Sequence, residues 1–298
     1  MDHCGDGGLS RLSDAILWDV TEGRAVDARP PAVGLYSNGV RGLGPEEFLD
    51  AAAAHGVTLV HLRGGPRGYG MASIPAEQVT ALARQAACAS SVTLITADAD
   101  LSDFASPEDA RWQQAGTELA SLAQVAREFG AGSVRVLARA VPSGPQWQAL
   151  AAIPDPAARH SVTMLIELHA PAWFTPKTAE RLCELMSRCT GLGLLLDSGQ
   201  VHDAWLQSPD APWASLLSGL IAHARVVHLS DRGCGLDGHG HHLLASAARD
   251  AADDGHELEV AFEWTGADRR LETCMTRYRA AVTWWEQAWR SAADPNSA

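Results

Sequence analysis

Residues 163–169 read Thr-Met-Leu-Ile-Glu-Leu-His, and residues 194–202 read Leu-Leu-Leu-Asp-Ser-Gly-Gln-Val-His. Each segment starts as an apolar run typical of a buried parallel strand and ends in one carboxylate, Glu167 or Asp197, with a histidine beyond it. Between them, residues 177–189 alternate polar and apolar side chains at helical spacing. The sequence therefore predicts a strand–helix–strand unit, whose right-handed crossover puts both carboxylates on one face of a sheet.

Two later runs continue this pattern. Residues 226–231 read Val-Val-His-Leu-Ser-Asp and contain His228, and residues 258–263 read Leu-Glu-Val-Ala-Phe-Glu and end in Glu263. Four consecutive predicted strands therefore carry Glu, Asp, His and Glu near their ends. The alternative interpretation, unrelated surface residues at strand ends, suits one such position better than four in succession.

The whole chain alternates predicted strands and helices. The four earlier strands are predicted at 32–36, 57–62, 92–96 and 133–137. Eight strands alternating with helices over about 260 residues predict an α/β fold, a (β/α)₈ TIM barrel whose strand ends converge on one mouth. An open doubly wound sheet is the competing arrangement, but it usually carries Gly-x-Gly-x-x-Gly after its first strand, and residues 37–42 lack that spacing.

The predicted barrel occupies residues 31–291, with an N-terminal extension at 1–30 and a tail at 292–298. The 298 residues carry a net charge of −13 and a single lysine, Lys177, which disfavours binding to nucleic acid. The six cysteines show no Cys-x-x-Cys spacing, as expected for reduced thiols in the cytoplasm. No apolar run reaches membrane-spanning length, and the N-terminus lacks the pattern of a signal peptide.

The four strand-end residues predict a metal site. Three carboxylates and one imidazole that meet at one point repel one another unless a cation lies between them. Oxygen ligands with one nitrogen suit one divalent ion, for which we expect Mn²⁺, with Mg²⁺, Co²⁺ and Zn²⁺ as alternatives.

The order Glu-x-His, Asp-x-Gly, His-x-x-Asp and a final Glu resembles the xylose isomerase-like TIM barrels. This family includes sugar and sugar-phosphate isomerases and epimerases, inosose dehydratase and endonuclease IV-type repair enzymes. The resemblance spans roughly residues 32–290 and includes Gly-His-Gly at 238–240. It implies that one metal ion is bound by Glu167, Asp197, His228 and Glu263. It also implies that Glu167 and Glu263 act as the acid/base pair, which suits removal and return of a proton next to a carbonyl group.

The chain departs from the family pattern at two places. Gln200 stands where members often have histidine three residues after the strand-six aspartate, and His202 is the nearest substitute. Many members carry an acid at the end of strand two, where this chain has His61 with Arg63 nearby. These changes leave the predicted metal ligands intact and concern the substrate.

We expect the substrate to contact residues at or just past the strand ends. The candidates are His61, Arg63, His169, His202 and Arg232 as hydrogen-bond donors and Trp264 as an apolar wall. The alternatives are a structural hydrogen bond for His169, a solvated ion pair with Asp231 for Arg232, and core packing for tryptophan. The cluster of His239, His241 and His242 is interpreted as a mobile solvent loop, with a lid or a second metal ligand as the alternative.

The leading hypothesis is a metal-dependent isomerase or epimerase that moves a proton next to a carbonyl on a small, sugar-like polyhydroxylated substrate. A lyase of the inosose-dehydratase type would begin with the same proton abstraction. An abasic-site endonuclease needs several metals, and Gln200 replaces one expected histidine. A barrel that only binds a partner is at odds with the complete ligand set. The expected partner is a small molecule, without nucleic acid or membrane, and a homo-oligomer remains open.

Overall fold

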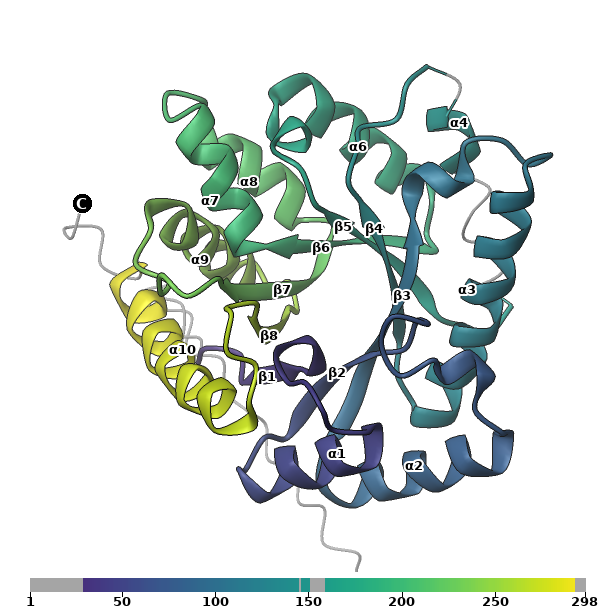
Figure 1. The fold of residues 1–298 in the computed structure, drawn as a ribbon. Helices are drawn as coiled ribbons and strands as arrows, with labels where there is room; N and C mark the ends of the chain where they lie inside the picture. Colours follow the sequence, from purple (N-terminus) through teal and green to yellow (C-terminus); the bar gives the residue numbers. More distant parts are fainter. Residues whose placement is uncertain (1–28, 145, 151–158, 293–298) are drawn as a thin grey trace, which may run out of the picture.

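The computed structural model describes residues 29–144, 146–150 and 159–292, and they contain a closed barrel of parallel strands in chain order (Figure 1). The strands are β1 Val33–Tyr36, β2 Leu59–Arg63, β3 Ser91–Asp100, β4 Ser133–Ala138, β5 Thr163–Leu168, β6 Leu192–Asp197, β7 Ala224–Asp231 and β8 Glu259–Trp264. The pairing of β1 with β8 closes the barrel. The predicted (β/α)₈ TIM barrel is therefore confirmed. The predicted extension up to residue 28 and the tail from residue 293 lie outside the described residues.

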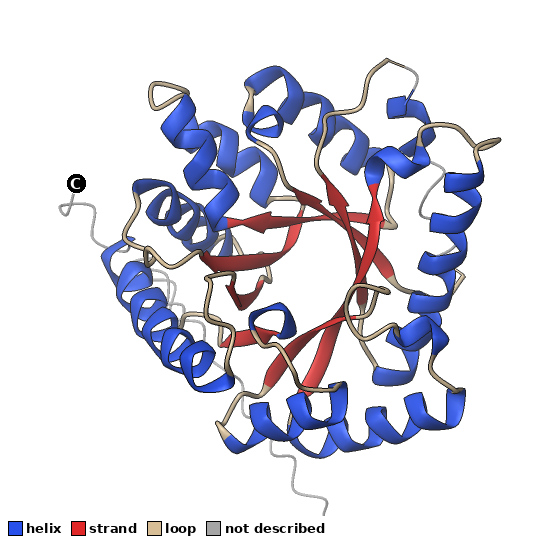
Figure 2. Ribbon diagram, viewed as in Figure 1, coloured by secondary structure: helices blue, strands red, loops and turns tan. Residues whose placement is uncertain are grey.

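Helices surround the strands on the outside (Figure 2). They are α1 Pro45–Ala54, α2 Ala76–Ala89, α3 Ala110–Phe129, α4 Gln146–Leu150, α6 Pro176–Arg188, α7 Ser198–Gln207, α8 Trp213–Ile221, α9 His239–Asp253 and α10 Leu271–Ala292. Short 3₁₀ turns are η1 Ser37–Gly39, η2 Met71–Ser73, η3 Leu101–Phe104 and η4 Pro171–Phe174. No helix in the described ranges combines the length and apolar content that crossing a membrane requires.

Local sequence signals explain where several helices begin and end. Pro45 occupies the first turn of α1, and the Glu47 carboxylate accepts a hydrogen bond from the Gly44 amide at 2.9 Å. Gly130 ends α3 with a left-handed backbone of φ 72°, a conformation that glycine adopts without strain. These two signals explain the start of α1 and the end of α3.

The segment directly after β6 is helical. Helix α7 begins directly at Ser198, because the Asp197 carboxylate accepts a hydrogen bond from the Gln200 amide at 2.9 Å and caps the helix.

The interpretation of the histidine cluster as a solvent loop is wrong, since His239 begins α9. His241 is buried, and its Nδ1 lies 2.8 Å from the Ser198 hydroxyl. His241 therefore packs α9 against α7 and lies in no loop.

Apolar side chains pack on both sides of the barrel wall. One large core lies between the strands and the helices. A smaller separate cluster consists of Leu94, Leu165, Leu195 and Val226. Three of its members stand two positions before Glu167, Asp197 and His228. Because side chains alternate along a strand, this apolar cluster lies inside the barrel, one layer beneath those three residues.

Candidate metal centre

The structure brings the four predicted ligands together. Glu167, Asp197, His228 and Glu263 come from β5, β6, β7 and β8, and all four are buried. One ligand atom from each lies within 4.8 Å of the others. Within the described ranges, no other group of three or more His, Cys, Asp or Glu side chains has this arrangement. The histidines at the start of α9 are therefore not placed as a second metal site.

The donor set fits a divalent cation. The 4.8 Å spacing is about twice the roughly 2.0–2.6 Å bond between such an ion and its nitrogen or oxygen ligands. His228 Nδ1 is buried without a hydrogen-bond partner and lies 3.4 Å from a Glu263 oxygen. Burial, reinforced by the carboxylates of Glu263 and Glu167, raises the pKa of Asp197 to about 7. A cation would relieve this repulsion and give the Nδ1 lone pair a partner.

Arg135 holds Glu167 from inside the barrel. Its Nε lies 2.8 Å from Glu167 Oε2, and both side chains are almost completely buried. Its NH2 also donates a hydrogen bond to the Tyr36 hydroxyl at 2.7 Å. Burial alone would raise the pKa of Glu167, but the Arg135 guanidinium outweighs it and the pKa is about 2. Glu167 is therefore an ionised candidate ligand with one oxygen fixed by Arg135. The signal for Arg135 in the sequence is a lone cation within the apolar strand 133–138.

The substitution Arg135→Met is expected to lower the free energy of unfolding of the metal-free protein by about 3–5 kcal/mol. The reason is that it leaves the buried Glu167 charge without a partner. Chemical denaturation measures the effect, and an added divalent metal should restore part of the loss by supplying positive charge. Arg139→Met is the control, because Arg139 pairs with Asp100 at 3.2 Å with 46% of its side chain exposed and should contribute at most about 1 kcal/mol. Equal losses in both variants would show that Arg135 does not balance Glu167.

Glu263 is held from the opposite side of the cluster. The side-chain amide of Asn38, in η1, donates a hydrogen bond to Glu263 Oε1 at 2.6 Å. Arg269 fixes Asn38 in turn by donating to its backbone carbonyl at 2.9 Å. Burial would raise the pKa of Glu263, but the neighbouring His228 ring and the hydrogen bond from Asn38 outweigh it and the pKa is lowered. The sequence analysis missed Asn38, since nothing local distinguishes it from a turn residue.

His61 does not lie at the mouth where the sequence placed it. Its side chain is fully buried beneath His228, with Nδ1 2.9 Å from His228 Nε2. Its Nε2 lies 2.5 Å from the carboxylate of Glu259. Burial lowers the pKa of His61, so the ring is neutral at neutral pH. With both nitrogens engaged inside the barrel, His61 has no atom free for a substrate.

Trp264 also differs from the expectation of an apolar wall. Because Glu263 faces the barrel interior, the next side chain along β8 faces the helices. The Trp264 indole is buried, donates to the Asp268 carbonyl at 2.6 Å and lies 5.2 Å beneath the Arg277 guanidinium. Core packing, the alternative considered for tryptophan, describes its position.

The remaining substrate candidates divide into one near the ligands and three engaged elsewhere. His169 is 40% exposed and its Nδ1 lies 3.6 Å from Glu167 Oε1, so it borders the cluster. Arg63 donates to the Arg67 carbonyl at 2.6 Å. Arg232 pairs with Asp203 at 2.5 Å and not with Asp231, as the sequence had suggested. His202 stacks on Trp205 with ring centroids 6.0 Å apart.

Comparison with known proteins agrees with this architecture. A family model described as xylose isomerase-like TIM barrel matches residues 49–271. No curated protein sequence matches the chain.

Solved structures resemble the fold at low sequence identity. An L-ribulose 3-epimerase shares 16% identity with a TM-score of 0.63, over 88% of this chain and 95% of that chain. A D-psicose 3-epimerase from Clostridium cellulolyticum H10, solved with D-tagatose, shares 11% with a TM-score of 0.61, over 88% and 96%. An IolI protein with a bound zinc atom shares 14% with a TM-score of 0.65, over 86% and 98%. At these identities the likeness shows the fold alone.

Proposed function

This chain belongs to the xylose isomerase-like TIM barrel family, and we propose that it is a divalent metal-dependent isomerase or epimerase of a small polyhydroxylated carbonyl compound. The observation that carries the proposal is the buried cluster of three carboxylates and one imidazole from four consecutive strands. Two of its members are glutamates held from opposite sides, Glu167 by Arg135 and Glu263 by Asn38. We propose Mn²⁺ as the ion, with Mg²⁺, Co²⁺ and Zn²⁺ as alternatives.

A divalent ion in this cluster supplies Lewis-acid stabilisation of negative charge on substrate oxygen. The protein supplies the proton transfers. Both glutamates have lowered pKa values and are carboxylates at neutral pH, so each is ready to accept a proton. One glutamate removes the proton next to the substrate carbonyl and becomes protonated. The same glutamate then returns this proton to the neighbouring carbon, or the other glutamate, after taking a proton from solvent, delivers it to the opposite face.

The two glutamates are held in different ways. Arg135 pairs with Glu167 Oε2, which leaves Glu167 Oε1 toward His169. A neutral amide, Asn38, holds Glu263 Oε1, and among the described residues no arginine or lysine lies at ion-pair distance from Glu263 Oε2. A full positive charge beside a carboxylate weakens it as a base more than an amide does. We therefore assign Glu263 as the principal base and Glu167 as its partner.

His169 is the proposed contact to substrate oxygen. The Glu167 carboxylate, 3.6 Å from His169 Nδ1, raises the pKa of His169, which favours the ring as a donor, and its partial exposure leaves it accessible. The epimerases among the similar structures are named for sugars, which agrees with an oxygen-rich substrate. The net charge of −13 argues against nucleic acid as substrate.

Proton NMR in D₂O tests the proposed reaction. Metal-loaded protein is incubated with a panel of small ketoses, including D-psicose, D-tagatose and L-ribulose, and with inososes. We expect the hydrogen on the carbon next to the carbonyl to be replaced by deuterium, with an isomer formed and no water lost. Protein stripped of metal by a chelator is the control and should show neither change.

Two results would contradict this assignment. A product lighter by one water would favour the lyase that begins with the same proton abstraction. Absence of exchange across the panel, in protein that retains its metal, would argue against proton transfer next to a carbonyl.

A further inference from the structure

A chain of hydrogen bonds runs beneath the metal centre. The Glu259 carboxylate lies 2.5 Å from His61 Nε2, and His61 Nδ1 lies 2.9 Å from His228 Nε2. The Thr93 hydroxyl donates to the same Glu259 oxygen at 2.7 Å and so holds the Glu259 end of the hydrogen-bond chain in place. The chain links β8, β2 and β7 through the barrel interior, and neither Glu259 nor His61 has a part in the proposed reaction.

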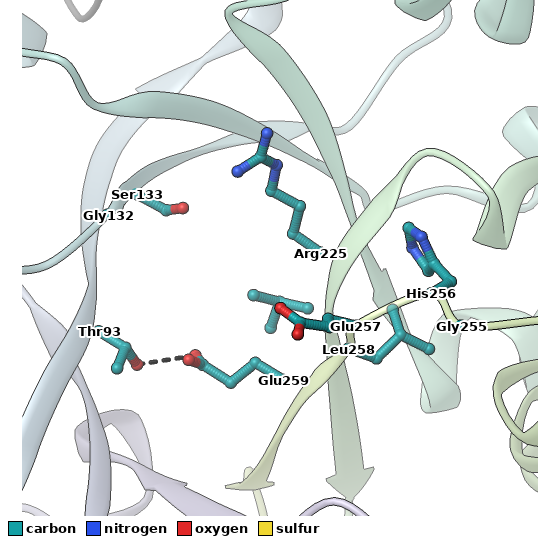
Figure 3. A pocket seen from close by; sticks show the side chains of 10 residues that line it. Thr93, Gly132, Ser133, Arg225, Gly255, His256, Glu257, Leu258 and Glu259 are labelled. Atoms are coloured by element: carbon teal, nitrogen blue, oxygen red, sulfur yellow. Dashed lines mark hydrogen bonds between the residues drawn. The ribbon is translucent and has the colours of Figure 1, made fainter. Parts of the chain in front are cut away.

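Glu259 is reached from the end of the barrel opposite the metal centre. Residues at the starts of strands line an opening of about 660 Å³ there, shown in Figure 3 with the contact between Thr93 and Glu259. The Glu259 side chain is 23% exposed, whereas His61 is 0% exposed. The hydrogen-bond chain therefore begins at solvent on one end of the barrel and ends at His228, a buried candidate metal ligand.

The hydrogen-bond partners determine where the ring protons lie. A carboxylate only accepts hydrogen bonds, so His61 Nε2 carries a proton and donates it to Glu259. In a neutral ring, His61 Nδ1 then has no proton and accepts from His228 Nε2. A neutral His228 that carries its proton on Nε2 has a lone pair on Nδ1. This is the nitrogen that faces the carboxylate cluster and has no hydrogen-bond partner.

We propose that Glu259 and His61 are positioning residues that set the tautomer and ring orientation of His228 from the opposite end of the barrel. The inference rests on the proposed metal centre. It adds which residues hold the His228 ring in the orientation and tautomer that a metal requires. Outer partners of metal-binding histidines orient the ring and fix the tautomer.

Without Glu259, the proton of His228 has a competing position. The Glu263 carboxylate lies 3.4 Å from His228 Nδ1 and attracts a proton to that nitrogen. A proton on Nδ1 blocks the lone pair that a metal requires, and the metal would have to displace it. Glu259 opposes this by drawing the proton to the other side of the ring through His61.

Nitrogen-15 NMR of histidine-labelled, metal-free protein tests the tautomers directly. We expect both His61 and His228 to carry their proton on Nε2. In Glu259→Gln the neutral amide no longer attracts the His61 proton with a full charge, so His228 should shift toward the Nδ1–H form. The dissociation constant for Mn²⁺ should rise by about 10- to 100-fold, the range for loss of an outer partner.

Glu257→Gln is the matched control. Glu257 lies in the same opening, is exposed and loses the same charge in this variant (Figure 3). It should leave the tautomers and the metal affinity unchanged. A second pair addresses His61, because His61→Gln retains one donor and one acceptor whereas His61→Leu retains neither. We expect the glutamine variant to bind Mn²⁺ more tightly than the leucine variant.

The outcomes separate this inference from the proposed function. A proton on Nδ1 of His228 in the unaltered protein, or equal Mn²⁺ affinity in Glu259→Gln and Glu257→Gln, would overturn the positioning role while the metal centre stands. Absence of Mn²⁺ binding by the unaltered protein would overturn the metal centre, and the NMR measurement would still decide the tautomers. Thermal unfolding of each variant verifies that the barrel is folded.

Discussion

Glu263→Gln is expected to lower turnover by about 100-fold to 10,000-fold while the protein keeps part of its metal. The substitution retains an oxygen that can accept the hydrogen bond from Asn38, so the side chain stays in place. It removes the carboxylate that accepts a proton, and general acid–base catalysis contributes on this scale. Steady-state kinetics on the substrate found by deuterium exchange and metal analysis by mass spectrometry measure the two effects separately.

The kinetic comparison is made at saturating metal, so that weaker binding does not pass for lost catalysis. Glu257→Gln serves again as the control, because it removes a carboxylate at the opposite end of the barrel and should leave turnover unchanged. Near-normal turnover of metal-loaded Glu263→Gln would show that Glu263 does not act as the base. The principal base would then be Glu167 or a group outside the cluster.

Asp197→Ala and His228→Ala are each expected to lose most of the bound metal. Each removes one of four ligands from a buried cluster, and the loss should exceed the roughly 100-fold expected for an outer partner. Equilibrium dialysis with Mn²⁺ measures the change. Full retention of metal in both variants would remove the basis for the centre.

Asp197 needs its own control because the same carboxylate caps α7 through the Gln200 amide. Alanine removes both roles, and the lost cap alone costs about 1 kcal/mol of stability. Asparagine is an equally good cap but a neutral, weaker ligand. Asp197→Asn should therefore keep the stability of the metal-free protein, but its affinity for the metal should be lower than that of the unaltered protein.

Much of the fold was predictable because most strands are short, mainly apolar runs. The alternation of eight such runs with segments of helical spacing predicted the barrel. The four candidate ligands were found from the same runs, since each is a polar residue that interrupts or ends one, and the structure brings them together. The sequence analysis did not identify Asp197 as a helix cap. It therefore did not predict that α7 begins at Ser198.

The surroundings of the ligands were less predictable because they depend on contacts distant in sequence. His61 and Glu259 are separated by 198 positions, and Asn38 and Glu263 by 225. No local pattern marks such partners. Trp264 was assigned to the mouth from its place beside Glu263, although alternation along β8 turns neighbouring side chains to opposite faces.

The closing contacts of the barrel have a consequence for the lifetime of the folded protein. All four candidate ligands come from the second half of the chain, but Arg135 and Asn38, which hold two of them, come from the first half. Tyr278 of α10 adds a bond across the same closure by donating to the Val33 carbonyl at 2.7 Å. The assembled site thus exists only once β1 has joined β8. An ion bound there would stabilise only the closed barrel. It would therefore slow the unfolding of the barrel and leave the rate of refolding almost unchanged.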